Sequence, residues 1–283
     1  MPETPPVVLS IAGFDPSSGA GVTADIKTIA AHGCYGVACI TSLTVQSTQG
    51  VRRVEACSSA VVAESLKELA QDIEIEAVHI GMLGSAQVAA TVAQFVADEA
   101  IRYQVLDPVL RSSSGTALVD AEGERVLRQQ LLPQASVITP NIDEASVLTG
   151  LPVTNLAEMK SAAHRLHEMG AKAVVITGGH LEKATDLLSF RTNKGIEQEV
   201  FTSEKSRSKS THGTGCAFST AMACHLALDR GLPEAVLLSK AYISAAIAKA
   251  YPLGKGIGPP NHLYRMHQQK RGASPPVEKE AMH

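Results

Sequence analysis

The sequence predicts an α/β protein with an open, mostly parallel, doubly wound sheet and helices on both faces. Short runs rich in valine and isoleucine show little polar alternation, as expected of strands buried on both faces. Helical patterns with apolar residues at steps of three and four separate these runs. Repeated strand–helix units imply parallel strands with right-handed crossovers. A closed eight-fold barrel fits the same alternation, but a late hairpin and two closing helices favour the open sheet.

The buried strands can be placed in order along the chain. They are expected at Val7–Ala12, Tyr35–Thr44, Ala77–Ile80, Gln104–Asp107, Ser136–Thr139 and Ala173–Thr177. Helices between them should bury trios of apolar residues that share one helical face. These trios are Val22, Ile26 and Ile29; Val62, Leu66 and Leu69; and Val88, Val92 and Phe95.

The last third of the sequence departs from this alternation. Thr185–Phe190 and Ile196–Phe201 flank the turn residues Thr192-Asn193-Lys194-Gly195 and predict a hairpin. Two alanine-rich helices follow, at about Gly213–Leu228 and Pro233–Ala250. The alternating units, the hairpin and the closing helices together predict one extended sheet.

No linker divides the chain, so residues 1–260 are predicted to form one domain. From Gly254 onward the chain is rich in Gly, Pro, Gln and Lys, and residues 261–283 are predicted to be a mostly mobile tail. Hydrophobic residues make up 45% of the 283 residues and charged residues 19%, which predicts an ample core. The net charge of −3 gives no general attraction for nucleic acid or an anionic membrane, so neither is an expected partner.

The cysteines and the start of the chain bear on the compartment. Five cysteines without C-x-x-C spacing disfavour a disulfide scaffold or a zinc site and suit a reducing compartment. The first residues lack the basic and apolar regions of a secretion signal. No apolar run is long enough to span a bilayer. The sequence therefore predicts a cytoplasmic protein.

The segment Thr211-His212-Gly213-Thr214-Gly215-Cys216 is the strongest functional signal, because it runs from a turn into an alanine-rich helix. Glycines there allow backbone N–H groups to converge, and the helix N-terminus adds partial positive charge. Such a nest suits an anion or a phosphoryl group in transfer. The same field is expected to favour the thiolate of Cys216. A glycine turn followed by an inert buried cysteine is the structural alternative.

A second glycine-bearing loop, Gly13 to Gly21, follows the first strand. Gly19–Ala24 matches the dinucleotide-binding pattern G-x-G-x-x-A, but no acidic residue follows at the end of the second strand to hold a ribose. The loop instead suits closure over a small polar ligand. Asp25 lies in the helix behind it, and its spacing favours a solvated helix residue over a ligand contact.

Polar residues also follow the later strands, where ligands gather in an open α/β sheet. Met82 would offer an adaptable wall for a flat ring, although such a methionine is more often core packing. Asp107 is well placed for Mg²⁺. Asn141 and Glu144 would form a capping box or arrange a nucleotide-bound Mg²⁺. Gly179, in Thr177-Gly178-Gly179, would let a ligand approach the backbone.

Taken in order, these segments resemble the ribokinase-like superfamily. Within it they are most similar to bacterial hydroxymethylpyrimidine/phosphomethylpyrimidine kinases of thiamin synthesis. The resemblance spans Val7 to about Pro260 and rests on Asp15–Gly21, Ala24–Thr28, Gly81–Leu83, Asp107–Val109, Thr139–Asn141 and Thr211–Cys216. It implies ATP-dependent phosphorylation of 4-amino-5-hydroxymethyl-2-methylpyrimidine and then of its monophosphate, with ATP and Mg²⁺ as cofactors. It also implies a homodimer or another homo-oligomer.

The resemblance implies a role for each matching residue. The aminopyrimidine pocket would be lined by Gly13, Asp25, Gln46, Met82 and Val109. Catalysis would fall to Cys216 and to the anion hole of Gly213, Thr214 and Gly215. The nucleotide would contact Asn141, Thr177, Gly179 and Thr211, and the metal would contact Asp107 and Glu144. Gln46 supports the substrate chemically, because its amide offers both a donor and an acceptor to an aminopyrimidine edge.

Three positions depart from the family pattern. Thr177 stands where the family usually has lysine, as in some pyridoxal kinases, and so removes an expected phosphate contact. Phe14 stands where the family commonly has serine, and Ser47 stands where the family usually has asparagine. Two alternatives therefore remain: a pyridoxal or pyridoxine kinase, and a non-catalytic pyrimidine sensor. For the kinase, the hypothesis is that Cys216 acts as base toward the substrate hydroxyl.

Overall fold

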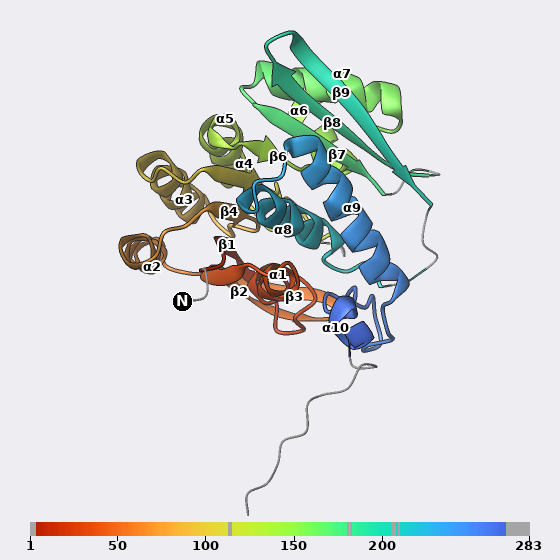
Figure 1. Ribbon diagram of the computed structural model, residues 1–283. Coiled ribbons are helices and arrows are strands. Elements are labelled where there is room, and N and C mark those ends of the chain that lie inside the picture. Colours follow the sequence, from red (N-terminus) through yellow and green to blue (C-terminus); the bar gives the residue numbers. More distant parts are fainter. Residues whose placement is uncertain are drawn as a thin grey trace, which may run out of the picture.

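The structure, a computed structural model, describes residues 4–112, 115–179, 181, 183–204, 208 and 210–269. Within these residues nine strands form one sheet in the order β3-β2-β1-β4-β5-β6-β7-β8-β9 (Figure 1). The strands from β2 to β7 run parallel in this order, whereas β3, β8 and β9 pair antiparallel with their neighbours. Because β3 and β9 are edges, the predicted open sheet is confirmed and a closed barrel is ruled out.

The predicted strands all form, with small shifts at their ends. Their bounds are β1 Val7–Phe14, β2 Tyr35–Ser47, β3 Gly50–Ala56, β4 Ala77–Ile80, β5 Tyr103–Leu106, β6 Val137–Ile138, β7 Ala173–Gly178, β8 Ala184–Thr192 and β9 Gly195–Ser203. The strand β3 was not predicted; it folds back antiparallel on β2. Its segment carries Arg52, Arg53 and Glu55, and this exposed edge lacks the apolar run that marks a buried strand.

Helices connect most of the strands and cover the sheet. They are α1 Gly21–Ala31, α2 Ser59–Asp72, α3 Ala86–Asp98, α4 Ala121–Val126, the π-helical turn η1 Leu127–Leu131, α5 Leu132–Gln134, α6 Ile142–Thr149, α7 Leu156–Glu168, α8 Thr214–Ala227, α9 Leu232–Ala248 and α10 Tyr264–Gln269. The predicted apolar trios on α1, α2 and α3 face inward, so the helical periodicity located these faces correctly.

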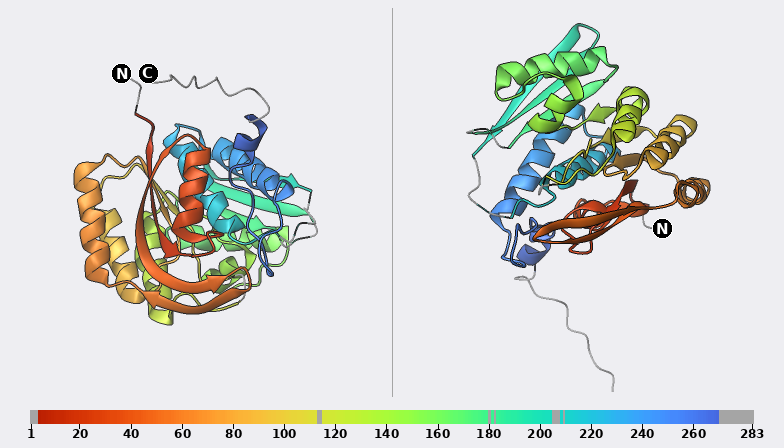
Figure 2. Two further views of the ribbon diagram at one scale, coloured as in Figure 1. Left: turned by 90° about the horizontal axis from the view of Figure 1, so that it is seen from below. Right: turned by 180° about the vertical axis from the view of Figure 1, so that it is seen from behind.

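Two hydrophobic cores lie on the two faces of the sheet. One joins the strands to α2, α3, α6 and α7, and the other joins them to α1, α8 and α9. Figure 2 shows the sheet between these two helix layers. The alanine-rich helix α8 packs directly on β1, β4 and β5. Small side chains allow this close approach, which brings the N-terminus of α8 to the carboxyl ends of these strands.

The folded domain extends beyond its predicted boundary at residue 260. Asn261 N donates to Ala246 O at 2.9 Å, and the side chains of His262 and Tyr264 are buried. His262 Nδ1 lies 3.1 Å from Thr28 Oγ1, so this segment ties α9 to α1. The first residues of the predicted tail are therefore part of the folded domain. Residues 270–283 of that tail lie outside the described residues.

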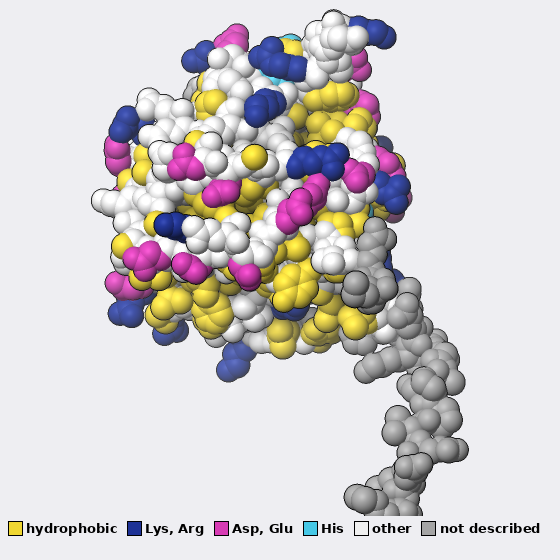
Figure 3. All heavy atoms as spheres, turned by 60° about the vertical axis from the view of Figure 1, so that its left-hand side comes forward, with side chains coloured by type: hydrophobic (Ala, Val, Ile, Leu, Met, Phe, Trp, Pro, Cys, Tyr) yellow, Lys and Arg dark blue, Asp and Glu magenta, His cyan; other side chains and the backbone are white. Residues whose placement is uncertain are grey.

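On the face shown in Figure 3, neither sign of charge dominates. Acidic and basic side chains are interspersed over the face shown in Figure 3. In the described part of the chain, no helix combines the length and apolarity needed to cross a membrane. The five cysteines are all free.

Candidate active site

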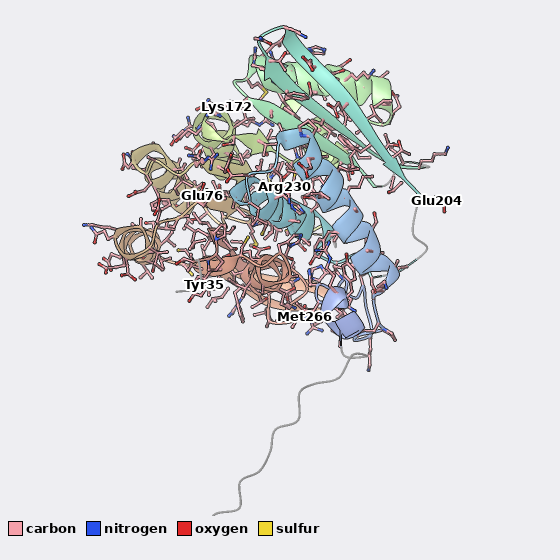
Figure 4. The ribbon with its side chains drawn as sticks, viewed as in Figure 1. Tyr35, Glu76, Lys172, Glu204, Arg230 and Met266 are labelled. Atoms are coloured by element: carbon pink, nitrogen blue, oxygen red, sulfur yellow. The ribbon has the colours of Figure 1, made fainter. Side chains whose placement is uncertain are left out.

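The predicted site residues gather at the carboxyl ends of the parallel strands. Figure 4 labels Tyr35, Glu76 and Lys172, which begin or precede β2, β4 and β7 and so mark the opposite edge of the sheet. At the carboxyl edge, the loop after β1 packs against Gly213 at the N-terminus of α8, and Asp107 after β5 lies close to Cys216 in the first turn of that helix. This is the position at which open α/β sheets bind ligands.

The loop before α8 forms an open nest at the helix N-terminus. Gly213 is the N-cap of α8 and has φ of 74°, a left-handed conformation that favours glycine. Thr214 N donates to the Thr211 carbonyl oxygen at 3.5 Å, but no side chain in the described chain caps α8, so the N–H groups that follow in its first turn can bind an anion. Space is also available, because a Cβ built at Gly215 would have no heavy atom within 4 Å.

The two glycine-bearing loops pack against each other. A Cβ at Gly213 would lie 2.0 Å from the carbonyl oxygen of Gly19, so only glycine permits this contact. On the same loop Thr214 Oγ1 donates to the carbonyl oxygen of Thr211 at 3.1 Å. The turn from Thr211 to Gly215 is therefore stabilised by the hydrogen bond of Thr214 within the turn and by packing against the loop that contains Gly19.

A pair of carboxylates lies next to this nest. Asp107 follows β5, and its buried Oδ2 has no hydrogen-bond partner among the described residues. Burial, followed by repulsion from Asp107, raises the pKa of Glu144 to about 8. An unsatisfied carboxylate oxygen beside a second buried carboxyl group fits a divalent cation, which would relieve the repulsion. The part of the chain that the structure describes has no group of three or more His, Cys, Asp or Glu suited to a metal, so phosphate oxygens or waters would complete the coordination.

Glu144 also serves the local fold. Its carboxylate accepts a hydrogen bond from Asn141 N, and Asn141 Oδ1 accepts one from Glu144 N, both at 2.9 Å. The predicted capping box of α6 is therefore confirmed. Thr177 lies beside Asn141, because Thr177 N donates to Pro140 O and the two residues form an isolated bridge. Gly179 is exposed with open space around it.

Cys216 is partly buried in the first turn of α8, between the nest and the carboxylates. Burial, followed by repulsion from Asp107 and Asp25, raises the pKa of Cys216 well above its usual value. The prediction that the helix field would favour the thiolate is therefore wrong, because nearby negative charge and burial outweigh the partial charge of the helix end. The resting side chain is a thiol.

Asp25 is fully buried, so its interpretation as a solvated helix residue is wrong. It accepts hydrogen bonds from Ser10 at 2.6 Å and Thr220 at 2.9 Å, and its Oδ2 lies 3.2 Å from His79 Nδ1. Burial alone would lower the pKa of His79, but Asp25 and then Asp107 outweigh it and raise this pKa to about 10. His79 is thus a buried imidazolium whose Nε2 lies 3.9 Å from Asp107 Oδ2. This network connects Asp25 to the carboxylate pair.

Gly13, Met82 and Gln46 lie near one another at the mouth of the site. A Cβ at Gly13 would come within 3.0 Å of Met82 Sδ and Ser42 Oγ, so the glycine admits the methionine side chain. The Gln46 amide lies 3.0 Å from His212 Nε2. Val109, partly buried, follows Asp107, to whose carbonyl oxygen its N–H donates at 2.8 Å. These residues bring an apolar wall and an amide to the carboxyl edge, as a flat polar ring requires.

Two residues of this site were not assigned from the sequence. His79 stands in the buried strand β4 between Val78 and Ile80, and a histidine in such an apolar run was the signal that could have identified it. His212 lies within the Thr211–Cys216 segment, but its partners Asp15 and Gln46 are 197 and 166 residues away along the chain. Only the fold brings these residues together.

The buried titratable groups predict maximal stability near pH 6.5. Burial lowers the pKa values of His225 and His262 to about 4, below the unfolded value of about 6.5. Between these values the unfolded chain binds more protons, so the free energy of unfolding falls as the pH falls. His79 and Glu144, with raised pKa values, contribute stability that is lost as the pH rises toward about 10 and about 8 respectively.

Urea unfolding from pH 4 to pH 9 measures this dependence. Below pH 6.5, His225→Gln should make the free energy of unfolding depend less steeply on pH. The reason is that the variant removes one group that binds a proton more readily in the unfolded chain than in the folded chain. A free energy of unfolding that continued to rise from pH 7 to pH 9 would contradict the prediction.

This chain is similar to proteins whose activity is known. The family described as phosphomethylpyrimidine kinase matches residues 15–261. A hydroxymethylpyrimidine/phosphomethylpyrimidine kinase of Streptomyces coelicolor is 38% identical, with 92% of this chain and 96% of that protein covered. A thiamine biosynthesis bifunctional protein of Geobacter sulfurreducens is 41% identical over 90% of this chain, which spans 52% of that relative's length.

Solved structures show the same fold. An ADP complex of Bacillus subtilis pyridoxal kinase superposes with a TM-score of 0.84 at 33% identity, covering 93% of this chain and all of that one. A phosphomethylpyrimidine kinase of Clostridium difficile gives a TM-score of 0.75 at 37% identity, covering 86% of this chain and 99% of that one. The family match over residues 15–261 and the 38% identity over nearly the full length of a curated relative identify this chain as a member of the phosphomethylpyrimidine kinase family.

Proposed function

We propose that this chain transfers the γ-phosphoryl group of ATP to the hydroxymethyl group of 4-amino-5-hydroxymethyl-2-methylpyrimidine, and then phosphorylates the monophosphate to the diphosphate. The supporting observation is the open nest at the N-terminus of α8, which faces the carboxylates of Asp107 and Glu144. Partial positive charge at the nest and a cation at the carboxylates would hold a phosphoryl group between them. Relatives named as kinases of this pyrimidine and its phosphate share the fold and more than a third of the sequence.

In this proposal each part of the site has a separate task. Gln46 and Met82 orient the aminopyrimidine, with Gly13 and Val109 completing the wall, while Asp25 supports the pocket from beneath through Ser10 and Thr220. Backbone N–H groups of Gly213, Thr214 and Gly215 receive charge that develops on the transferred group. Asn141, Thr177, Gly179 and Thr211 surround the nucleotide. Positioning and electrostatics supply most of the rate acceleration.

Asp107 and Glu144 would hold Mg²⁺, since their repulsion and the unsatisfied Asp107 Oδ2 fit a cation. When bound there, Mg²⁺ would neutralise both carboxylates and the phosphate oxygens. Its charge would also offset the repulsion that keeps Cys216 protonated. With its own proton released to solvent, the Cys216 thiolate would then accept the proton of the substrate hydroxyl.

A pyridoxal or pyridoxine kinase is the second candidate. Thr177 and the close superposition on a pyridoxal kinase favour it. The amide of Gln46 at the mouth of the pocket favours the aminopyrimidine instead, because it matches adjacent donor and acceptor atoms on that ring. A cytoplasmic location and assembly into a homodimer or another homo-oligomer stay predictions.

One assay separates the candidates. ATP consumption is measured with hydroxymethylpyrimidine, its monophosphate and pyridoxal as acceptors at saturating Mg²⁺. We expect kcat/KM for both pyrimidines to exceed that for pyridoxal by at least about 10-fold, because the hydrogen-bonding edge differs. The reverse order would assign the chain to vitamin B6 phosphorylation. Tight pyrimidine binding in a thermal-shift experiment without turnover would indicate a non-catalytic sensor.

A further inference from the structure

His212, in the loop before α8, contacts both the loop after β1 and the end of β2 through a single ring nitrogen. Its Nε2 lies 2.8 Å from Asp15 Oδ2 in the first loop and 3.0 Å from the amide of Gln46 at the end of β2. The ring also lies against Gly19, where a Cβ would come within 2.3 Å of its Cδ2. Only glycine at this position leaves room for the imidazole between Asp15 and Gln46.

The surroundings of Asp15 determine whether Asp15 Oδ2 or His212 Nε2 carries the hydrogen that lies between them. Asp15 Oδ1 accepts hydrogen bonds from the N–H and the hydroxyl of Ser17 at 2.8 and 2.7 Å, and Oδ2 accepts from the N–H groups of Gly19 and Ala20 at 3.2 and 3.1 Å. A carboxyl group surrounded by this many donors is ionised. An ionised Oδ2 at 2.8 Å from His212 Nε2 requires that this nitrogen carries a hydrogen and donates it.

The proton on His212 in turn restricts the Gln46 amide. In the structure the amide nitrogen of Gln46 faces His212 Nε2 at 3.0 Å, so that two N–H donors point at each other. Turning the amide by 180° places its oxygen there, where it shares the Nε2 hydrogen with Asp15. The oxygen and nitrogen of an amide occupy nearly equivalent places, so this 180° turn leaves the contact distances unchanged.

Thr44 fits the same orientation from the other side of the amide. Its Oγ1 lies 3.0 Å from the Phe14 carbonyl oxygen and 3.1 Å from the amide oxygen of Gln46, and its single hydroxyl hydrogen can serve only one of these acceptors. After the 180° turn, Thr44 Oγ1 donates to Phe14 and accepts from the amide nitrogen. With oxygen toward His212 and nitrogen toward Thr44, every polar contact of Gln46 pairs a donor with an acceptor.

We propose that the His212–Asp15 pair fixes the direction of the Gln46 amide and thereby makes the pocket select a 4-aminopyrimidine edge over a 4-oxopyrimidine edge. An aminopyrimidine presents a donor beside a ring-nitrogen acceptor, whereas the oxo form presents an acceptor beside a ring N–H donor. A fixed amide complements one of these orders, and an amide free to turn complements both. His212 is a positioning residue here, and the inference rests on the proposed function for the identity of the preferred ring.

The test compares 4-amino-5-hydroxymethyl-2-methylpyrimidine with its 4-oxo analogue in full-length protein. We expect the wild type to prefer the amino compound by about 100-fold or more in kcat/KM, because the wrong order leaves two polar groups unpaired. His212→Leu removes the donor and should reduce this preference to less than about 10-fold. His212→Gln restores a nitrogen donor near the same place and should recover most of the preference.

Lys27→Met is the matched control. Lys27 Nζ donates to Ser18 O at 2.5 Å, so its loss loosens the same loop without touching Gln46. It should change kcat/KM for both compounds by the same factor. If His212→Leu keeps the wild-type preference, or if Lys27→Met abolishes it equally, the fixed amide is refuted and His212 only holds the loop.

A measurement on the wild type keeps the inference testable if a variant does not fold or if neither pyrimidine is phosphorylated. Nitrogen-15 NMR of the His212 ring at pH 8 reports which nitrogen bears the hydrogen. A protonated Nε2 supports the proposal, and an Nε2 without hydrogen overturns it whatever the activity. Absence of turnover by the wild type with both compounds would count against the proposed function, and calorimetric affinities for the two compounds would then give the preference directly.

Discussion

Replacing Cys216 with alanine is expected to slow phosphorylation of hydroxymethylpyrimidine by about 100- to 10,000-fold, the range that a general base contributes. Phosphorylation of the monophosphate should slow far less. A primary alcohol must lose its proton during transfer, whereas a phosphate monoester is mostly dianionic at pH 7, since its second pKa is about 6. Single-turnover rates for each acceptor, measured at saturating ATP and Mg²⁺, provide the comparison.

The variant Cys216→Ser distinguishes a role of Cys216 as general base from a purely structural role. A hydroxyl group preserves the approximate volume of the thiol but is far harder to deprotonate, so a base role predicts a loss close to that of alanine in the first round. If serine restores the first round, or if alanine slows both rounds equally, Cys216 is a structural part of the anion hole. The raised pKa of the resting thiol makes this distinction necessary.

Gly213→Ala is expected to reduce turnover of both acceptors by about 100- to 1,000-fold, comparable to the loss of an oxyanion-hole donor. The left-handed backbone at φ of 74° disfavours alanine, and its Cβ would lie 2.0 Å from Gly19 O. The two loops must separate to relieve this overlap. Separation displaces the N–H groups that, in the proposed mechanism, face the transferred phosphoryl group, so kcat should fall together with the affinity for ATP.

Gly33→Ala is the control for backbone strain. Gly33 has a similar φ of 77°, but a Cβ there would have no heavy atom within 4 Å, and it lies in the turn between α1 and β2 at the edge opposite the site. Its replacement should destabilise the chain by about 1–2 kcal/mol through the left-handed conformation alone and leave turnover unchanged. If Gly213→Ala behaves in the same way, the contact between the loops is not needed for catalysis.

The sequence predicted the sheet well because burial on both faces leaves a local signature. Ala77–Ile80 was placed without error, and the hairpin of β8 and β9 was recognised from its turn residues. The edge strand β3 was missed, since an exposed edge permits polar residues and has no distinctive period. The segment after residue 260 was assigned to the tail because its polar composition hides the burial of His262 and Tyr264, which depends on α1 and α9.

Some features of the candidate site could likewise be predicted from local sequence, whereas others depend on the fold. Glycines in Thr211–Cys216 and carboxylates after strands are local features, so their positions could be predicted from the chain alone. The protonation of Cys216 could not, because it depends on carboxylates that approach from β5, α1 and α6. Asp25 was interpreted as solvated for the same reason: its burial requires Ser10, His79 and Thr220 from three other elements.

By itself, the sequence determined the sheet, the position of the glycine-bearing loop before α8 and the family of this protein, because each of these follows from residue types at short spacing. Only the tertiary structure decided the electrostatics of the site, including the imidazolium of His79, the resting thiol of Cys216 and the contact of His212 with Asp15 and Gln46. The physical reason is that a charge responds to every group within several ångströms, and folding brings those groups together from distant parts of the chain.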